Sequence, residues 1–451
     1  MDFKKVFLIL VVFINSAFLF GSQSEKHKNQ SRQISKAQID EEIGTFDGNR
    51  IFTYMKNNGQ FVYQKDGDSG MFWPGRESNK TICYEAGFWV AGMVNGDIRT
   101  ACADFESEWT AGKILPNGEP DDPENPRYRL YKINRGDLIN PEVNPDFLEW
   151  PVEDGAPWID QDGDGLYEPL EGDRPDLLGD QMVWYVMNDL ESTKHKDVLG
   201  SAPLGLECRV TIWGYNRPDE VGDMMFCKFQ LFNKMENVID SCYVGIRADT
   251  DLGGVGDEFI GCDTTLNLGF CYNDGPDGVY GEACPALGFN LFQGAIVSSK
   301  GDTARGFGQV FQDYKNLGMS VLSKIINNDD DYPDPETPLE CWNLMSGLRF
   351  NGEPFINPIT NKPVVPVLYA PGDPVSGTGW LWAMDHPPGN IRLLQTSGPF
   401  TMAPGDSQEV IVACIIARGS NALNSVTRLK QVSTIAQGAY NYNFDYQSAP
   451  P

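Results

Sequence analysis

Histidine is nearly missing from this chain, whose 451 residues contain only His27, His195 and His386. No Cys-x-x-Cys pair occurs either, so neither a structural zinc site nor a thioredoxin-like centre is expected. The sequence also lacks Gly-x-Ser-x-Gly, His-Glu-x-x-His, a P-loop and a dinucleotide-binding glycine pattern. His195 stands in the polar run 192–197 and His386 precedes two prolines, so both are predicted to be surface residues rather than catalytic bases. The sequence therefore contains no recognisable catalytic constellation.

Basic residues are scarce: 35 Lys and Arg stand against 63 Asp and Glu, which gives a net charge of −28. A surface of this charge repels nucleic acid and anionic membranes, so neither is an expected partner. The excess of acid suits a solvated extracellular protein or one that recruits cations. Solubility alone would explain the excess equally well.

Long hydrophobic runs are confined to the N-terminus. Lys4 and Lys5 precede the apolar run Val6–Phe20, and the small residues Gly21 and Ser22 follow it. This order is typical of a secretory signal peptide, and an uncleaved anchor is the alternative. The run is shorter than the roughly 20 apolar residues of a membrane span. No second run of that length follows, so we expect a secreted protein, extracellular or at the cell surface, whose mature chain has no membrane span.

Cysteine is too sparse for a disulfide scaffold. An even number of cysteines in an exported chain permits disulfides, but their pairing cannot be deduced from the sequence. Buried free thiols are the alternative for several of them. The ten cysteines all lie beyond the signal peptide, at positions 83, 102, 208, 227, 242, 262, 271, 284, 341 and 414.

Long helical patterns are also rare, and short apolar segments separated by Gly, Asn, Asp and Pro replace them from Arg50 onward. Apolar and polar residues alternate in Cys227–Phe232, which is the period of a half-buried strand. The chain is therefore predicted to be mainly β, with antiparallel β-sandwich layers, long loops and one C-terminal amphipathic helix. The segments that predict strands are 50–55, 60–64, 87–94, 181–188, 206–216, 224–233, 241–249 and 265–273.

The exceptional helical pattern lies near the C-terminus. Leu423, Val426, Leu429 and Val432 recur at helical spacing, which predicts an amphipathic helix over 421–440. The apolar segment 408–417 just before it predicts a fully buried strand. Composition then divides the chain into a signal peptide (1–22), a disordered leader (23–45), an N-terminal β region (46–116), a loop-rich segment (117–180) and a β-sandwich region that ends in the helix (181–445).

The strongest motif is the segment 160–171, which reads DQDGDGLYEPLE. Acidic side chains fall at loop positions one, three, five, nine and twelve, and a glycine at position six lets the chain turn. This is the EF-hand loop pattern, which supplies the roughly six to eight oxygen ligands of calcium. The predicted calcium ligands are Asp160, Asp162, Asp164, the backbone carbonyl of Leu166, Glu168 and Glu171.

The flanks of this loop differ from those of an EF-hand. Pro157, Pro169 and Pro175 surround or interrupt it, and neither side shows a helical period. We therefore predict a structural calcium clasp rather than a sensor, with a metal-free Asp-Gly turn as the alternative. A second acidic loop, 249–258, could also gather oxygens, but a solvated turn is the preferred interpretation there.

These observations lead to two functional hypotheses. The first is a secreted or cell-surface structural, adhesion or ligand-binding protein with a structural calcium loop, whose partners are extracellular polysaccharide or other surface proteins. The alternative is an exported polysaccharide-binding protein or a glycoside hydrolase. A hydrolase needs only two carboxylates across a cleft, a signature that is invisible among 63 acids. Exposed aromatic side chains would stack on sugars, although most of the aromatic residues are expected in the core.

Several segments of the chain carry a resemblance to a known family. They are GAPW (155–158), DGDG (162–165), GDQMVWYVMNDL (179–190), PLGLE (203–207), MMFCKFQLFNK (224–234), the stretch 242–273 with its DTDLG, GCDTT and LGFCYN phrases, ALGFNLFQG (286–294) and APGDSQEVIVACIIARG (403–419). In these segments the chain resembles large exported proteins of environmental bacteria that usually carry a C-terminal type IX secretion sorting domain.

The resemblance implies a location at the cell surface or in released material. It implies no activity that can be named and supplies no catalytic residue to carry over. Members of the family usually continue past a Pro-rich hinge into immunoglobulin-like modules and a sorting tail. By that resemblance, residues 446–451 are expected to be the start of such a hinge.

Overall fold

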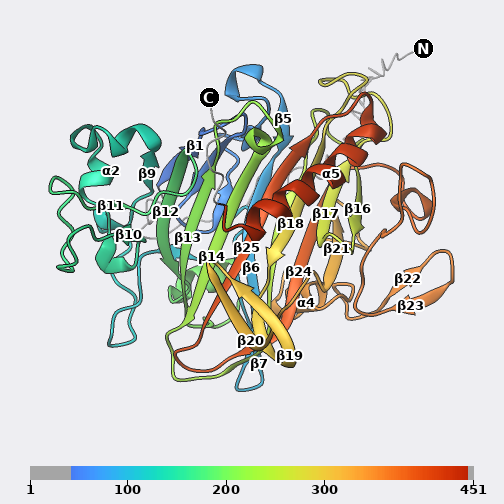
Figure 1. Ribbon diagram of the computed structural model, residues 1–451. Helices are drawn as coiled ribbons and strands as arrows, with labels where there is room; N and C mark the ends of the chain where they lie inside the picture. The colour runs from blue at the N-terminus through green and yellow to red at the C-terminus, as the bar shows by residue number, and fades with distance from the viewer. Residues whose placement is uncertain (1–41, 445–451) are drawn as a thin grey trace, which may run out of the picture. The chain divides into compact units, whose positions relative to one another are not determined.

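Two large antiparallel sheets face each other and bury the apolar side of their strands between them (Figure 1). The computed structural model describes residues 42–444. The rings of Phe88 and Phe229, one from each sheet, stack in this interface with their centroids 4.0 Å apart. The predicted mainly β fold with antiparallel sandwich layers is therefore confirmed.

The larger sheet has nine strands, and its middle strands are apolar on the face toward the other sheet. Four of the five strand segments predicted between residues 181 and 273 belong to it, namely 181–188, 206–216, 224–233 and 265–273, and so does the predicted strand 408–417. In spatial order the strands are β16 (Phe259–Asp263), β17 (Leu268–Tyr272), β18 (Ala286–Gln293), β25 (Ser407–Ala417), β14 (Met224–Asn233), β13 (Leu206–Gly214), β12 (Gln181–Asn188) and β8 (Thr110–Ala111), and β9 (Tyr131–Asn134) also pairs with β12.

The smaller sheet has six strands and contains both early and late parts of the chain. Strands from the predicted regions 46–116 and 181–445 therefore lie side by side in one sheet, since β6 pairs with β15. The strands in spatial order are β21 (Val321–Ile326), β24 (Ile391–Met402), β15 (Ile239–Asp249), β6 (Glu85–Val94) and β3 (Gln60–Val62), and β7 (Asp97–Cys102) pairs with β6.

The remaining strands form one small sheet and isolated hairpins. The small sheet contains β1 (Ile43–Phe46), β2 (Phe52–Lys56), β4 (Met71–Phe72) and β5 (Thr81–Cys83). The two-stranded pairs are β10 (Trp158–Ile159) with β11 (Arg174–Pro175), β19 (Ile296–Gly306) with β20 (Gln309–Asn316), and β22 (Phe355–Asn357) with β23 (Lys362–Val364).

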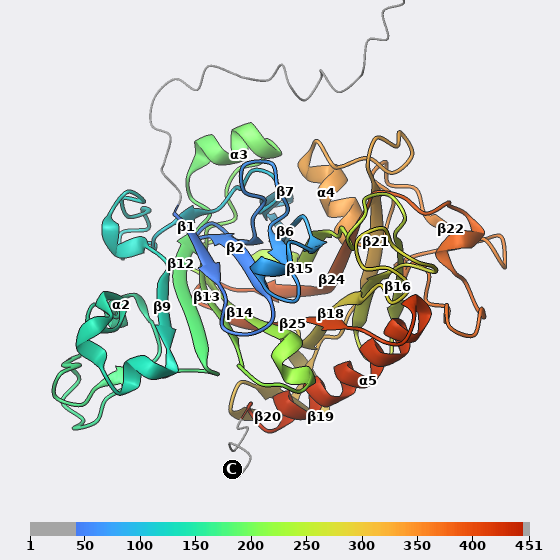
Figure 2. The ribbon, with the colours of Figure 1, turned by 90° about the horizontal axis from the view of Figure 1, so that it is seen from above.

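One long helix, α5 (Ala422–Asn441), packs on the nine-stranded sheet along β17, β18 and β25 (Figures 1 and 2). Val426, Leu429 and Val432 are buried beneath it, so the predicted amphipathic helix is confirmed. The other helices are the short α2 (Pro145–Leu148), α3 (Ser192–Val198) and α4 (Pro338–Met345), and the 3₁₀ turns η1 (Arg76–Ser78), η2 (Pro126–Tyr128), η3 (Arg135–Leu138), η4 (Pro141–Val143), η5 (Val152–Asp154), η6 (Glu220–Asp223) and η7 (Trp382–Met384). Within residues 42–444, no helix combines the length and apolar character needed to cross a membrane.

Several predicted features lie near the termini, beyond residues 42–444. The signal peptide 1–22, most of the leader 23–45 and the hinge 446–451 lie outside the described residues. Strand β1 begins at Ile43, inside the predicted leader, because it pairs with β2 and buries Phe46 completely. All ten cysteines are buried and none is joined in a disulfide in this structure; buried free thiols were the alternative expected for several of them.

Candidate functional site

The predicted calcium loop is the connection between β10 and β11. These two strands pair antiparallel, with Trp158 opposite Pro175 and Ile159 opposite Arg174. Short strands therefore flank the loop, and there is no helix on either side to form a helix–loop–helix pair, as the prolines predicted. The backbone of Asp176 also donates a 3.0 Å hydrogen bond to the carbonyl of Pro157, which extends the closure by one position.

An aromatic contact anchors the loop to the body of the protein. The rings of Tyr167 and Trp158 meet edge to face, with centroids 5.7 Å apart. The Tyr167 hydroxyl donates a 2.7 Å hydrogen bond to the carbonyl of Phe147 at the end of α2. The base of the loop is thus fixed, while the acidic residues 160–166 remain largely exposed.

The first aspartates turn their carboxylates back into the loop. Asp160 accepts hydrogen bonds from the backbone N–H groups of Gly163 at 2.6 Å and Gly165 at 2.9 Å. Asp164 in turn accepts one from Leu166 at 2.8 Å. Gly165 has φ of 82°, a left-handed conformation that costs glycine little, and this explains the glycine at loop position six.

The structure brings four of the predicted carboxylates together with one further acid, in two overlapping groups. Asp160, Asp162 and Asp173 form one, and Asp162, Asp164 and Glu168 form the other. In each group the carboxylate oxygens lie within 4.8 Å of one another, the spacing at which they could hold one metal ion. Because Asp162 belongs to both groups, the carboxylates form one continuous acidic cluster.

Asp173 is the ligand candidate that sequence reasoning missed. Its side chain is buried, and its two oxygens accept hydrogen bonds from the backbone of Gln161 at 2.9 Å and of Glu168 at 2.8 Å. These bonds tie the start of the loop to its end. The residue lies beyond the twelve-residue EF-hand frame, and the only available signal was an acid directly after Gly172.

Two predicted ligands, Leu166 and Glu171, lie outside the two carboxylate groups. Glu171 belongs to neither carboxylate group, although its backbone N–H donates a 2.8 Å bond to the carbonyl of Glu168. Leu166 has an exposed side chain, and its carbonyl oxygen stays a predicted ligand. Glu171 and the Leu166 carbonyl therefore stay predicted calcium ligands.

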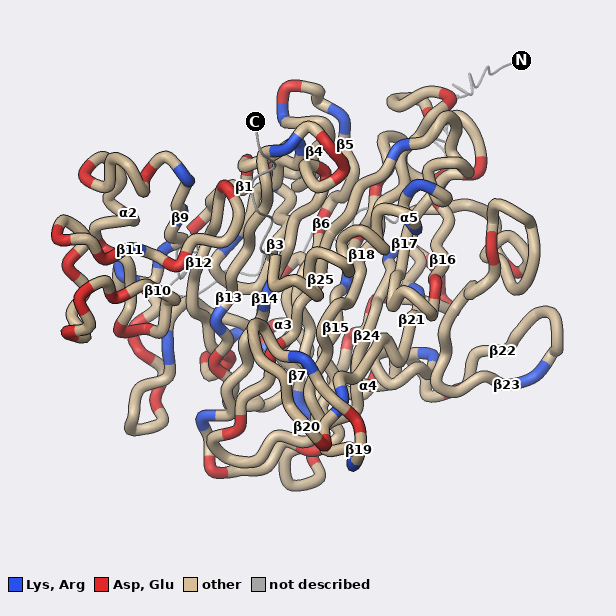
Figure 3. Tube along the Cα trace, in the orientation of Figure 1, with Lys and Arg blue, Asp and Glu red and all other residues tan. Residues whose placement is uncertain are grey.

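The carboxylates of the loop repel one another, and this repulsion shifts the pKa of Glu168. The pKa of Glu168 is raised, chiefly by the negative charge of Glu171, then by burial, and then by the charges of Asp164 and Asp162. Figure 3 shows acidic residues crowded around β10 and β11. Carboxylates placed this close favour either protonation or a cation, and a divalent cation relieves more repulsion than a proton does.

The second acidic loop is not the solvated turn that we predicted. Asp249, Asp251 and Glu258 are all buried. Arg392, from β24, approaches Asp249 at 3.0 Å, and this partner from a distant strand is what local sequence cannot show. Burial raises the pKa of Asp251 to about 7 and that of Glu258 to about 8. Among the described residues this loop contributes to no carboxylate group with metal-ligand spacing.

The prediction that His195 lies on the surface is wrong, because α3 places its ring in the interior with no exposed area. Its Nε2 lies 2.6 Å from the carbonyl oxygen of Asp189, and its Nδ1 lies 3.3 Å from the hydroxyl of Ser201. Burial opposes the charged ring, but Glu108 and Asp189 outweigh it and raise the pKa of His195. A ring without exposed surface cannot meet a substrate. His386 is half-buried between Tyr332 and Trp382.

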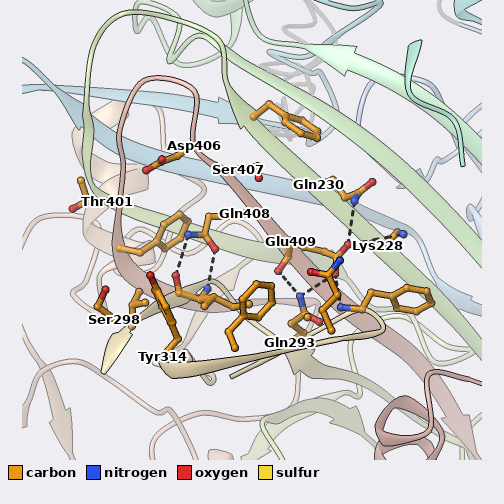
Figure 4. Close-up of a pocket in the computed structure, with 18 residues that line it drawn as sticks. Lys228, Gln230, Gln293, Ser298, Tyr314, Thr401, Asp406, Ser407, Gln408 and Glu409 are labelled. Atoms are coloured by element: carbon orange, nitrogen blue, oxygen red, sulfur yellow. Dashed lines mark hydrogen bonds and ion pairs between the residues drawn. The ribbon is translucent and has the colours of Figure 1, made fainter. Parts of the chain in front are cut away.

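A groove of about 1020 Å³ opens between the β19–β20 hairpin and the ends of β14 and β25 (Figure 4). Lys228, Gln230 and Phe232 line it from β14, and Glu409 lines it from β25. Phe311 and Tyr314 line it from the hairpin. The alternation in 227–232 predicted a half-buried strand here, but alternation alone does not reveal that a hairpin overhangs the polar face of β14.

Comparison with known proteins adds no assignment: no family model matches the chain, and no curated protein is significantly similar to it. The resemblance to exported type IX proteins stays a prediction.

Proposed function

We propose that this chain is an exported protein of the cell surface or extracellular space, stabilised by one calcium ion at loop 160–173 and acting in structure, adhesion or ligand binding. The observation that carries the proposal is the convergence of Asp160, Asp162, Asp164, Glu168 and Asp173. The order of residues 1–22, the acidic charge and the resemblance to exported type IX proteins support the location.

Calcium suits this loop better than other metals. All of the grouped ligands are carboxylates, and hard cations prefer oxygen, whereas zinc and copper sites draw on imidazole or thiolate. A flexible oxygen cage favours calcium over magnesium, which requires near-ideal octahedral geometry. Glu171 and the Leu166 carbonyl would complete the ligand set. Affinity near about 10⁻⁴–10⁻³ M is expected, as in extracellular modules.

The ion would act as a clasp. The loop-rich segment 117–180 has little regular structure, and its acidic end closes on a pair of two-residue strands. Neutralising the repulsion in the loop would fix that closure and the contact of Tyr167 with Phe147. The loop is flanked by the short strands β10 and β11 and not by a pair of helices that calcium could move apart. We therefore propose a structural ion and not a sensor.

Thermal melting with calcium and with a chelator tests the clasp. At ten times Kd the ion adds about 1.4 kcal/mol of stability, which raises Tm by a few degrees in a domain of this size. Asp160→Ala combined with Asp164→Ala should abolish this response. Asp330→Ala, at an exposed acid outside the loop, is the matched control and should keep it. A melting curve that calcium and chelator leave unchanged would refute the proposal.

The alternative function, an exported polysaccharide-binding protein, is favoured by one separate observation, the groove beneath the β19–β20 hairpin. A glycoside hydrolase has less support. The carboxylates that line the groove are Asp406 and Glu409, and hydrogen bonds from surrounding side chains and backbone already hold Glu409.

A further inference from the structure

We propose that the groove between the β19–β20 hairpin and the strands β14 and β25 binds a segment of a neutral oligosaccharide or polysaccharide chain. This inference rests on the proposed ligand-binding function and gives it a site and a ligand class. It does not depend on the calcium loop, which is built from a different part of the chain.

The groove floor is the outer face of the nine-stranded sheet. Lys228, Gln230 and Phe232 alternate along β14 and share that face. Gln230 pairs in register with Glu409, and Phe232 pairs with Ser407, so β25 continues the same surface. The hairpin β19–β20 forms the opposite wall. Figure 4 shows Lys228, Gln230, Gln293 and Glu409 at one end of the groove, and Ser298, Tyr314 and Thr401 toward the other.

Glu409 is held rigidly at its end of the floor. Its carboxylate accepts hydrogen bonds from the amides of Gln230 at 3.1 Å and Gln293 at 3.0 Å. The backbone N–H of Phe307, at the tip of the hairpin, donates a third bond of 3.0 Å. These bonds fix the carboxylate in place before any ligand arrives, which lowers the ordering cost of binding.

Lys228 lies beside Glu409 without a hydrogen bond of its own. Its side chain is only 8% exposed, and its nearest acidic oxygen, on Glu409, is 3.9 Å away. The ammonium also lies over the Phe307 ring, 4.7 Å from the centroid. Among the described residues this Nζ makes no hydrogen bond, and its only ion pair is the one with Glu409. The ammonium lines the groove, so its three N–H donors are available to a molecule bound there. Hydroxyl oxygens of a ligand would accept hydrogen bonds from them.

The upper part of the groove offers aromatic faces. Phe311 is 36% exposed and Tyr314 is 41% exposed, both on β20, and Phe232 lines the floor. A sugar ring presents an apolar C–H face and hydroxyl edges, so it needs flat apolar rings next to groups that donate and accept hydrogen bonds. Gln309 and Ser298 add such groups along the hairpin.

Other ligand classes fit this surface less well. An anionic ligand would meet Glu409 and Asp406 on a chain of net charge −28. A lipid would leave the Lys228 and Glu409 charges buried against hydrocarbon. A peptide that adds as a strand would pair with an outer edge of the two-stranded β19–β20 hairpin and would leave the floor, which is a sheet face, without a partner. The volume of about 1020 Å³ lies at the upper end of the ~300–1000 Å³ range of small-molecule sites, which leaves room for several sugar rings.

Calorimetric titration tests the site. The full chain is titrated with the neutral hexasaccharides of glucose, mannose, xylose and galactose, and binding to at least one is expected. Phe311→Ala combined with Tyr314→Ala should weaken that binding on the order of tenfold, because two stacking faces are lost. Val310→Ala is the matched control: it lies on the same strand, is exposed, and does not line the groove, so affinity should not change.

The outcomes are separable from those of the calcium test. Binding to none of the four sugars by folded protein, equal binding by the double aromatic variant, or preference for charged polygalacturonate would each overturn this inference. Titrations are repeated with calcium and with chelator. Retained sugar binding without a calcium effect on Tm would refute only the clasp. A calcium effect without sugar binding would refute only the groove.

Discussion

At the scale of single residues, partners from distant strands decide what each charged side chain does. The carboxylates of loop 160–173 could be predicted because their ligand pattern is local. Asp173 could not, since its role depends on hydrogen bonds that close the loop. His195 was misjudged because the short helix α3 buries a residue whose local sequence is polar.

Asp251 provides a prediction at this scale. Burial, and then the charge of Asp249, raise its pKa from 3.8 to about 7, while Arg392 opposes the shift. A carboxyl whose pKa is raised by folding contributes stability that is present below about pH 4 and is lost as the pH rises toward 7. Asp251→Asn removes this titration, so it should be more stabilising at pH 8 than at pH 5 by roughly 2–3 kcal/mol, since each pH unit between 5 and 7 changes the wild-type stability by about 1.4 kcal/mol.

Urea unfolding of wild type and variant at both pH values measures this difference. Asp330→Asn, at an exposed carboxyl, serves as the control and should show the same small effect at pH 5 and pH 8. A difference between Asp251→Asn and wild type that does not change with pH would contradict a buried, protonated Asp251.

At the scale of elements, periodicity predicted the strands and the long helix well. Segments such as 181–188 and 224–233 match β12 and β14, and α5 extends only one residue past the predicted end. The signal was strong because one face of each element is buried. The β19–β20 hairpin was missed, since β20 is almost wholly exposed and its sequence shows no apolar stripe.

The contact between β7 and α4 provides a test of the proposed export. The Sγ atoms of Cys102 and Cys341 lie 3.6 Å apart, and both side chains are fully buried. Burial raises the pKa of Cys102, so the folded thiol is unreactive and a disulfide would form during folding.

Protein recovered from an oxidising compartment should therefore weigh two hydrogen atoms less than the fully reduced chain. In Cys102→Ser this mass difference between the recovered and the reduced protein should disappear. Cys242→Ser, at a buried cysteine elsewhere, should keep the difference. Ten titratable thiols after denaturation of the secreted protein would contradict export through an oxidising compartment.

At the scale of the whole molecule, the order of strands in each sheet could not be read from the sequence. The central pairs β6–β15 and β14–β25 join segments that lie far apart in the chain, and no local pattern encodes such pairing. Net charge, by contrast, is fully known from composition. A net charge of −28 destabilises the compact state, because like charges lie closer together in the folded chain than in the unfolded one.

That repulsion and the calcium clasp should be separable by salt. Sodium chloride should raise Tm because it screens surface charges beyond a Debye length of about 8 Å at physiological ionic strength. At matched ionic strength the proposed clasp predicts that calcium chloride raises Tm further, since calcium, unlike sodium, would bridge the carboxylates of Asp160, Asp162 and Asp173. In the Asp160→Ala, Asp164→Ala variant the two salts should give the same curve. Coincident curves for the wild-type protein would mean that the loop adds charge but no binding site, and that screening alone accounts for every stabilising effect of calcium.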